Sequence, residues 1–87
     1  MDNSSGVGVI DKAAHVLDAL EAGPTTLAQL VAATGLARPT VHRLALALVH
    51  HRLVSRDIQG RFVLGSRLVE LASAAGESRG RSLFVDQ

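Results

Sequence analysis

The most constraining feature of the sequence is a pair of helix boundaries only a few residues apart, in the stretch "AATGLARPTVHRLALAL". Gly35 suits the position just after a helix end, and Pro39 suits the first turn of the next helix. After Pro39, apolar residues recur at the spacing of one helical face: Val41, Leu44, Ala45 and Leu48. Two short helices joined by a glycine-containing turn predict a helix-turn-helix.

The flanking segments extend this prediction. Ile10, Ala13, Ala14, Leu17 and Leu20 form an apolar stripe that predicts a first helix from Val9 to Gly23-Pro24. Thr26-x-x-Gln29 is a capping box that begins a second helix, which ends near Thr34-Gly35. The third helix is expected from Pro39 to about His51, with Arg38 near its N-cap.

Beyond the third helix the apolar period changes from 3.6 to 2. Two strands are expected, Leu53 to Arg56 and Arg61 to Leu64, joined by a turn from Asp57 to Gly60. A fourth helix then begins at Gly65 or Ser66 and is expected to stop at Gly76. Its predicted inward face consists of Leu68, Leu71, Ala72 and Ala75.

This order predicts a mainly α fold with a small β-hairpin, a winged helix-turn-helix. It has a three-helix core, a two-stranded wing and a C-terminal linker helix. We expect a flexible N-terminal arm over residues 1–8, the domain over residues 9–76 and a C-terminal tail over residues 77–87. A chain of 87 residues is long enough for one such small domain.

Composition excludes several other classes of protein. There is no cysteine, and the two phenylalanines are too few for single-strand binding by base stacking. No apolar run reaches the roughly 20 residues that span a bilayer, and no signal peptide is recognisable, so a cytoplasmic location without membrane contact is expected. No catalytic constellation is apparent, which predicts a protein that is not an enzyme. We expect no metal or cofactor site, because no carboxylate or cysteine stands at ligand spacing beside the histidines: His15, His42, His50 and His51.

Charge is concentrated in the middle of the chain. Six arginines and one aspartate give residues 38–67 a net charge of +5, although the whole chain carries only +1. The first third and the last third are both acidic on balance. This segment is therefore expected to face an anionic partner, and double-stranded DNA fits a helix-turn-helix.

The third helix is expected to place its N-terminal end in the major groove. Arg43 can reach guanine O6 and N7, and Thr40 can meet a base edge or a thymine methyl group. Arg38, Thr26 and Arg61 are expected to contact the phosphate backbone. The candidate DNA-binding residues are Thr26, Arg38, Pro39, Thr40, His42, Arg43 and Arg61.

Other interpretations stay open at this stage. The arginines could form a merely solvated surface, Thr26 could act only as a helix cap, and Arg61 could pair with Asp57. A winged-helix protein-interaction module is the alternative function, supported by Leu46 on the otherwise polar side of the third helix. Salt dependence distinguishes the two functions, because DNA binding weakens steeply with salt.

The sequence resembles the N-terminal domain of IclR-type transcriptional regulators. The matching segments are "VIDKAAHVLDAL", "LAQLVAATGLARPTVHRLALALVHHRLVSRD" and "GRFVLGSRLVELA". The amino-acid sequence in the first two segments is especially similar to the NdgR/LeuR-like branch of the family. This resemblance implies control of leucine or other amino-acid metabolism genes.

The resemblance also implies a homodimer, formed through the first helix, on a palindromic operator. Ala13 and Ala14 are small enough for close approach, and Val9 and Val16 lie beside the core stripe. Family members continue into an effector-binding domain that residues 77–87 do not resemble. We therefore expect that domain to be absent and no effector to bind to this chain.

Overall fold

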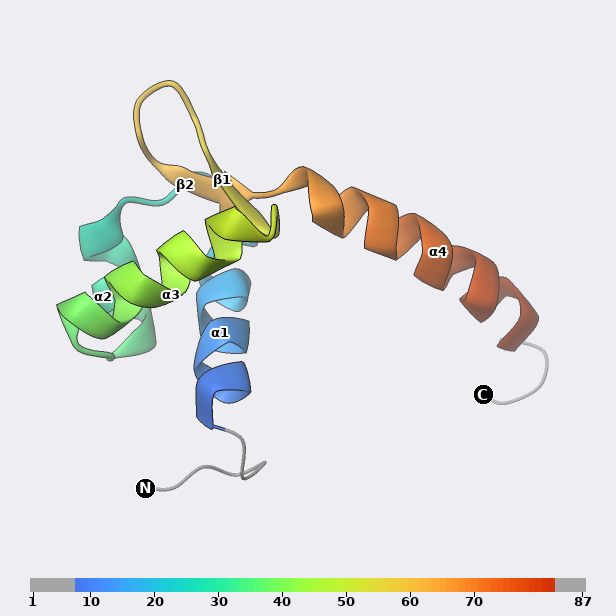
Figure 1. Cartoon of the computed structure of the whole chain (residues 1–87), viewed down its shortest axis with the longest axis horizontal. Coiled ribbons are helices and arrows are strands. Elements are labelled where there is room, and N and C mark those ends of the chain that lie inside the picture. The colour runs from blue at the N-terminus through green and yellow to red at the C-terminus, as the bar shows by residue number, and fades with distance from the viewer. Residues whose placement is uncertain (1–7, 83–87) are drawn as a thin grey trace.

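A computed structural model describes residues 8–82 of the chain, with side chains described for residues 8–76. Three helices pack around one another, a hairpin covers one end of them, and a fourth helix leads away (Figure 1). The elements are α1 (Gly8–Ala19), α2 (Leu27–Thr34), α3 (Arg38–His50), β1 (Val54–Arg56), β2 (Phe62–Leu64) and α4 (Ser66–Ser82). The predicted winged helix-turn-helix fold is confirmed.

Both ends of α2 are fixed by the residues that the sequence indicated. The Thr26 hydroxyl accepts a hydrogen bond from the Gln29 N–H at 3.1 Å, and the Gln29 side chain accepts one from the Thr26 N–H at 2.9 Å. At the other end, Gly35 adopts a left-handed conformation with φ of 72° and donates its N–H to Val31. Such a conformation costs a residue with a Cβ free energy, so glycine suits this turn.

The third helix begins at Arg38, one residue earlier than predicted. Ala37 is its N-cap, in an extended conformation, and Pro39 lies in the first turn. Proline has no N–H to leave unpaired there, which makes it compatible with a helix start.

The core joins the three-helix body to the hairpin. Its buried members are Val16, Leu20, Leu30, Val41, Ala45, Leu48, Val54 and Phe62. β1 and β2 pair antiparallel, with Val54 opposite Leu64. Phe62 also exchanges two backbone hydrogen bonds with Thr25, of 2.8 and 2.9 Å, which attach the wing to the connection between α1 and α2. The predicted turn is confirmed, because the Gly60 N–H donates to the Asp57 carbonyl oxygen at 2.9 Å.

The predicted stripe of α1 was partly wrong. Val16, which was placed beside the stripe, is completely buried, whereas Ile10 is 63% exposed and Ala14 is also exposed. The helix extends past α2 and α3 at its N-terminal end, so its first turn finds no core to cover it (Figure 1). A substitution at Val16 would therefore test the core and not a dimer interface.

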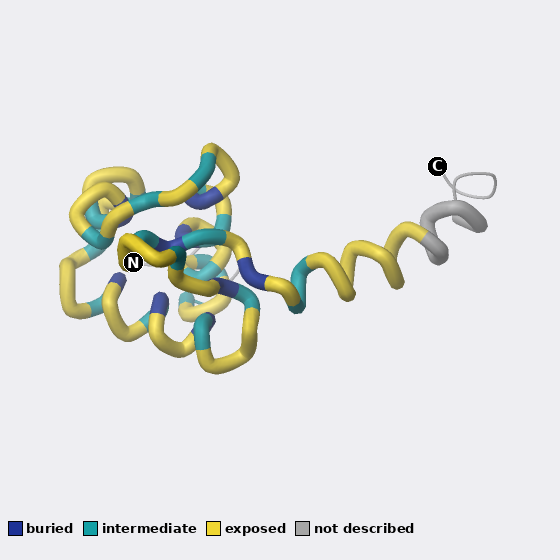
Figure 2. The backbone as a smooth tube through the Cα atoms, turned by 90° about the horizontal axis from the view of Figure 1, so that it is seen from above, coloured by how far each residue is buried: buried dark blue, intermediate teal, exposed yellow. Residues whose placement is uncertain are grey.

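The predicted inward face and the predicted end of α4 were also wrong. The helix continues through Gly76 to Ser82, and Leu71, Ala72 and Ala75 are exposed where an inward face was expected. Figure 2 shows this helix leaving the body with most of its described surface open to solvent. A glycine inside a helix costs only about 1 kcal/mol relative to alanine and does not by itself end the helix.

The two predicted terminal segments are only partly described. The arm predicted for residues 1–8 lies outside the described residues, except that Gly8 begins α1. The tail predicted for residues 77–87 is helical up to Ser82, and residues 83–87 lie outside the described part.

The first turn of α4 is fixed to the end of α3 by tight packing and ion pairs. Arg52 adopts a left-handed conformation, with φ of 62°, and its carbonyl oxygen accepts the Arg67 N–H at 3.0 Å. Gly65 is buried so closely against this backbone that a Cβ there would overlap the Arg52 carbonyl group. Glu70 binds the Arg52 guanidinium at 3.2 and 3.3 Å and the Arg67 guanidinium at 2.9 Å. We call these three side chains the α4 clamp.

Candidate nucleic-acid interface

The exposed face of α3 carries most of the predicted contact residues. Because Val41, Ala45 and Leu48 are buried, the rotation of α3 about its own axis is fixed. Arg43 is exposed on the opposite side, and Thr40 is half-buried beside it. The helix therefore presents a long cationic side chain to solvent, with a shorter hydroxyl-bearing side chain beside it.

A second part of the surface lies where the N-termini of α2 and α3 meet. A hollow of about 300 Å³ is lined there by Leu27, Arg38, Pro39 and His42. Arg38, Pro39 and His42 are exposed. Three of the predicted residues are thus brought together around one depression at the start of the recognition helix.

Thr26 lies at the N-terminus of α2 and caps this helix. Its hydroxyl oxygen already accepts the Gln29 N–H, so the capping function is present. A threonine hydroxyl can donate one hydrogen bond in addition to those it accepts. The cap therefore leaves one donor that can reach a phosphate oxygen, next to the N–H groups of the first helical turn.

Arg61 forms the ion pair with Asp57 that was left open as an alternative. Its Nε donates to Asp57 Oδ2 at 2.9 Å, and Asp57 Oδ1 accepts the N–H groups of Gln59 and Arg61, both at 2.9 Å. Desolvation raises the pKa of Asp57, but these hydrogen bonds and the Arg61 charge outweigh it, so the pKa is lowered overall. The ion pair organises the hairpin loop and uses one of the five N–H donors of the guanidinium.

The arginines of the basic segment, residues 38–67, have different partners in the structure. Arg52 and Arg67 bind Glu70 in the α4 clamp, and Arg61 binds Asp57. The Arg56 guanidinium lies 4.6 Å from the centre of the Phe62 ring, a cation–π contact. Arg38 and Arg43 have no ion pair with any described residue. Net charge alone could not show this division, because it depends on tertiary contacts.

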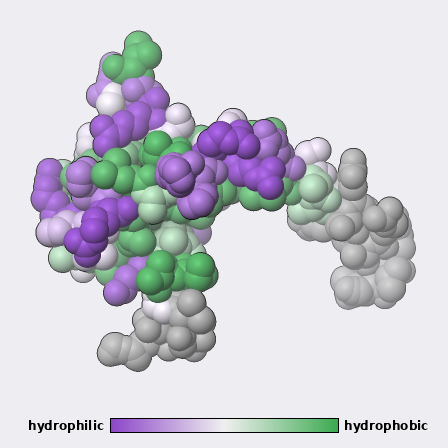
Figure 3. Space-filling view, in the orientation of Figure 1, coloured by the Kyte–Doolittle hydropathy of each residue, from purple (hydrophilic) through white to green (hydrophobic). Residues whose placement is uncertain are grey.

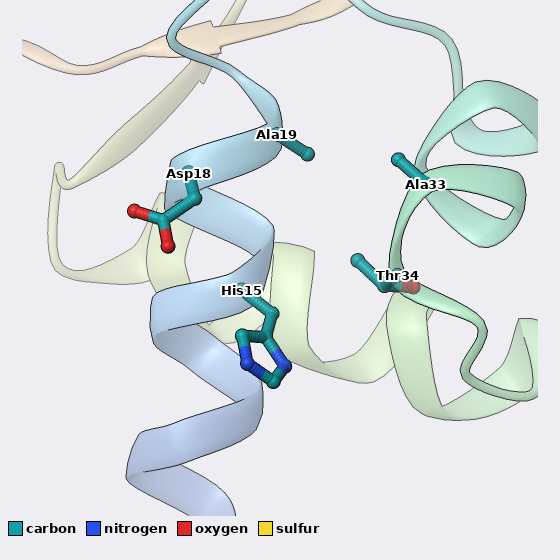
Figure 4. A pocket seen from close by; sticks show the side chains of 5 residues that line it. All are labelled: His15, Asp18, Ala19, Ala33 and Thr34. Atoms are coloured by element: carbon teal, nitrogen blue, oxygen red, sulfur yellow. The ribbon is translucent and has the colours of Figure 1, made fainter.

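One further surface feature was not predicted as a site. A hollow of about 350 Å³ lies between α1 and α2, where Ala19 and Ala33 face one another and His15 lies below them (Figure 4). Among the described side chains of residues 8–76, no three histidine, cysteine or acidic groups gather in a metal-binding arrangement. Within residues 8–82, no helix combines the length and apolarity needed to cross a bilayer.

The fold and the exposed recognition helix define the class of the protein as a winged helix-turn-helix DNA-binding domain. The family profile of the IclR helix-turn-helix domain matches residues 9–57, which is more than half of the chain. The chain belongs to the IclR family and carries the helix-turn-helix domain of this family of transcriptional regulators, a domain that points to DNA binding and not to catalysis.

Several solved structures share this fold. An IclR transcriptional regulator from Alicyclobacillus acidocaldarius is 30% identical, with a TM-score of 0.74 over 79% of this chain and 29% of its own. HmgR from Pseudomonas aeruginosa is 28% identical, with a TM-score of 0.73 over 83% of this chain and 31% of its own. An IclR homologue from Microbacterium hydrocarbonoxydans, solved with 4-hydroxybenzoate, is 26% identical, with a TM-score of 0.71 over 86% of this chain and 33% of its own.

The chain therefore spans about a third or less of the length of these solved regulators. No match was found among curated proteins. These comparisons support the family and the fold, while the branch that regulates amino-acid metabolism receives no support from them.

Proposed function

We propose that the chain binds a specific double-stranded DNA sequence, as a homodimer on a palindromic operator, and so regulates transcription. The observation that carries this proposal is the exposed face of α3, where Arg38 and Arg43 have no ion pair with any described residue. Two arginines without an ion pair to any described residue, on the helix that would enter the major groove, suit an anionic ligand.

The individual contacts follow from the positions of the side chains. Arg43 and Thr40 would contact base edges, with His42 and Pro39 beside them at the start of α3. Arg38 and Thr26 would contact phosphates from the two helix N-termini. Arg61 would contact a backbone phosphate with the guanidinium donors that Asp57 leaves free.

The test is selection of bound sequences from random duplex DNA, followed by titration of the selected palindrome, one half-site and random DNA at several salt concentrations. We expect cooperative binding to the palindrome, poor binding to the half-site and a steep decrease of affinity with salt. Arg43→Ala should lose about 1–3 kcal/mol of discrimination against random DNA.

Matched variants separate these roles from general charge effects. Arg67→Ala removes an arginine of the α4 clamp and should leave discrimination unchanged. Arg61→Ala should reduce the salt slope by about 0.9 if Arg61 contacts a phosphate. Asp57→Asn breaks the same ion pair but keeps the arginine, so its slope should stay that of the unmodified protein. Equal slopes for all of these proteins would remove the wing from the contact surface.

The proposed dimer uses the uncovered first turn of α1. Val9 and Ile10 are 68% and 63% exposed, and Figure 3 shows hydrophobic surface at this end of the helix. Ile10→Asp should weaken self-association in sedimentation experiments. Ile58→Asp, which changes a fully exposed isoleucine in the hairpin loop, should not. A dimer that Ile10→Asp leaves intact would place the interface elsewhere.

The remaining parts of the proposal concern the regulated genes and the ligands. The resemblance to the NdgR/LeuR-like branch motivates the proposal that the targets are leucine or other amino-acid metabolism genes, acted on in the cytoplasm. The Microbacterium homologue binds 4-hydroxybenzoate, whereas we propose that no effector binds to the described residues of this chain. Genes adjacent to the selected operator sequences would test the choice of targets.

A protein-interaction module remains the second candidate function, because Leu46 is exposed on α3. Apolar docking of a protein would depend little on salt. Weak, salt-insensitive binding to DNA without any selected sequence would favour this function over the proposed one.

A further inference from the structure

Leu46 is an exposed apolar side chain in the middle of a cationic surface. Its exposed fraction is 45%, although it lies on a helix whose opposite face supplies much of the core. It follows Arg43 by three residues, and Ala47 follows Arg43 by four, so both lie one helical turn beyond Arg43 on the same side. The placement results from the fixed rotation of α3 and is incompatible with burial of Leu46 in the same body.

The chemical surroundings of Leu46 indicate what covers it. The exposed residues of α3 include two arginines and two histidines but no carboxylate: Arg38, Pro39, His42, Arg43, Leu46, Ala47 and His50. Such a face complements the negative potential of DNA. Among the groups at base edges in the major groove, the C5-methyl group of thymine is the apolar one.

We propose that Leu46, with Ala47 beside it, contacts the C5-methyl group of a thymine next to the guanine that Arg43 reads. This inference rests on the proposed DNA-binding function and adds to it the recognition of a second base. Residues three apart on a helix are separated by about 4.5 Å along its axis, and successive bases by about 3.4 Å. The thymine therefore lies one or two base steps from the guanine.

The experiment uses the palindrome selected from random DNA and replaces single thymines with deoxyuridine, which removes only the methyl group. At one position near the guanine, this replacement should weaken binding of the unmodified protein about fourfold, the equivalent of ~0.8 kcal/mol for one buried methylene-sized group. Leu46→Ala should bind the thymine and deoxyuridine duplexes with nearly equal affinity.

The matched control is Leu71→Ala, which shortens a leucine of similar exposure on α4. This variant should keep the full fourfold preference for thymine. Arg43→Ala should lose recognition of guanine yet retain sensitivity to the methyl group, which separates the two contacts.

Two results would overturn the inference while leaving DNA binding intact. One is a selected site in which no thymine near the guanine responds to deoxyuridine. The other is an unchanged thymine preference in Leu46→Ala, and weakened self-association of the same variant would then assign Leu46 to a contact between two copies of the chain. Absence of any sequence-specific binding would instead contradict the proposed function itself.

Discussion

Helices α3 and α4 both carry apolar residues at helical spacing, yet they use them differently. On α3 the stripe packs into the core, where Val41 and Ala45 are completely buried. On α4, Val69 is 72% and Leu71 is 42% exposed, and no described residue covers that side of the helix beyond its first turn. The period of an apolar stripe therefore indicates a helix and its faces, but it does not identify the partner of the apolar face.

The two helices also differ in what holds them in place. α3 is held by apolar contacts with α1, α2 and the hairpin, which involve no titrating group and no charge for salt to screen. α4 is held at its root by the buried Gly65 and by the α4 clamp, whose three charged side chains are exposed. We therefore expect the packing of α3 to determine the stability of the three-helix body. The contacts of Gly65 and the α4 clamp should determine the direction in which α4 leaves that body.

The largest expected effect is on the free energy of unfolding when a core leucine of α3 is shortened. Leu48→Ala should reduce it by about 2–5 kcal/mol, because the core cannot collapse fully around the missing atoms. Leu71→Ala on α4 should change it by less than about 0.5 kcal/mol, as surface substitutions usually do. Urea unfolding followed by circular dichroism at low protein concentration measures both.

An equal loss for the two variants would contradict the comparison. It would show that the stripe of α4 is buried in solution within the unit that unfolds cooperatively. Repeating the Leu71→Ala measurement at higher protein concentration would then reveal whether a second copy of the chain provides the cover.

A smaller effect is expected at the junction between the two regions. Gly65→Ala should destabilise the protein by about 1–3 kcal/mol, because its Cβ would overlap the Arg52 backbone and the junction must shift. Gly76→Ala is the matched control: apart from the helix's own neighbouring backbone, a Cβ at Gly76 meets no atom within 4 Å, and alanine favours the helix by about 0.5–1 kcal/mol. Thermal unfolding shows whether each variant is stabilised or destabilised. Distances between spin labels on α1 and α4 report whether the direction of α4 has changed. A neutral Gly65→Ala with unchanged distances would show that this close packing does not set the direction.

The sequence was sufficient for those parts of the fold that depend on local chemistry. The capping box at Thr26, the left-handed Gly35 and the proline in the first turn of α3 each act within a few residues, so their positions could be predicted. The exposure of Arg43 followed from the period of α3, since the buried face determines the opposite one.

Other features depend on contacts distant in the sequence and were therefore missed. The bonds between Thr25 and Phe62 join segments 37 positions apart, and the α4 clamp joins Arg52 to Glu70. From the sequence, the Arg61–Asp57 pair was only an alternative, and the binding of Arg52 and Arg67 to Glu70 was not predicted. The exposure of α4 was missed because a stripe of Leu and Ala is equally compatible with a core and with an external partner.

The smallest expected effect is on the pH dependence of stability. It compares two carboxylates that bind arginines, Glu70 at the start of α4 and Asp57 in the hairpin loop. Hydrogen bonds from Arg52 and Arg67, together with their charges, lower the pKa of Glu70. A carboxyl group with a lowered pKa in the folded state adds stability above its unfolded pKa, and this contribution disappears as pH falls through the folded pKa.

Glu70→Gln should therefore lower the melting temperature slightly at neutral pH, and the difference should close below about pH 4, near the ordinary range of glutamate. Because the clamp is exposed, salt should also reduce the difference. Asp57→Asn should show a pH dependence of the same sign, because the pKa of Asp57 is lowered too. Its difference should close at a lower pH than that of Glu70→Gln, since aspartate ordinarily titrates below glutamate. The two variants should loosen different parts of the molecule. Amide hydrogen exchange should become faster at the start of α4 in Glu70→Gln and in the hairpin loop in Asp57→Asn. Faster exchange throughout α1 to α3 in Glu70→Gln would show that the clamp stabilises the whole body and that α4 is not an independently held region.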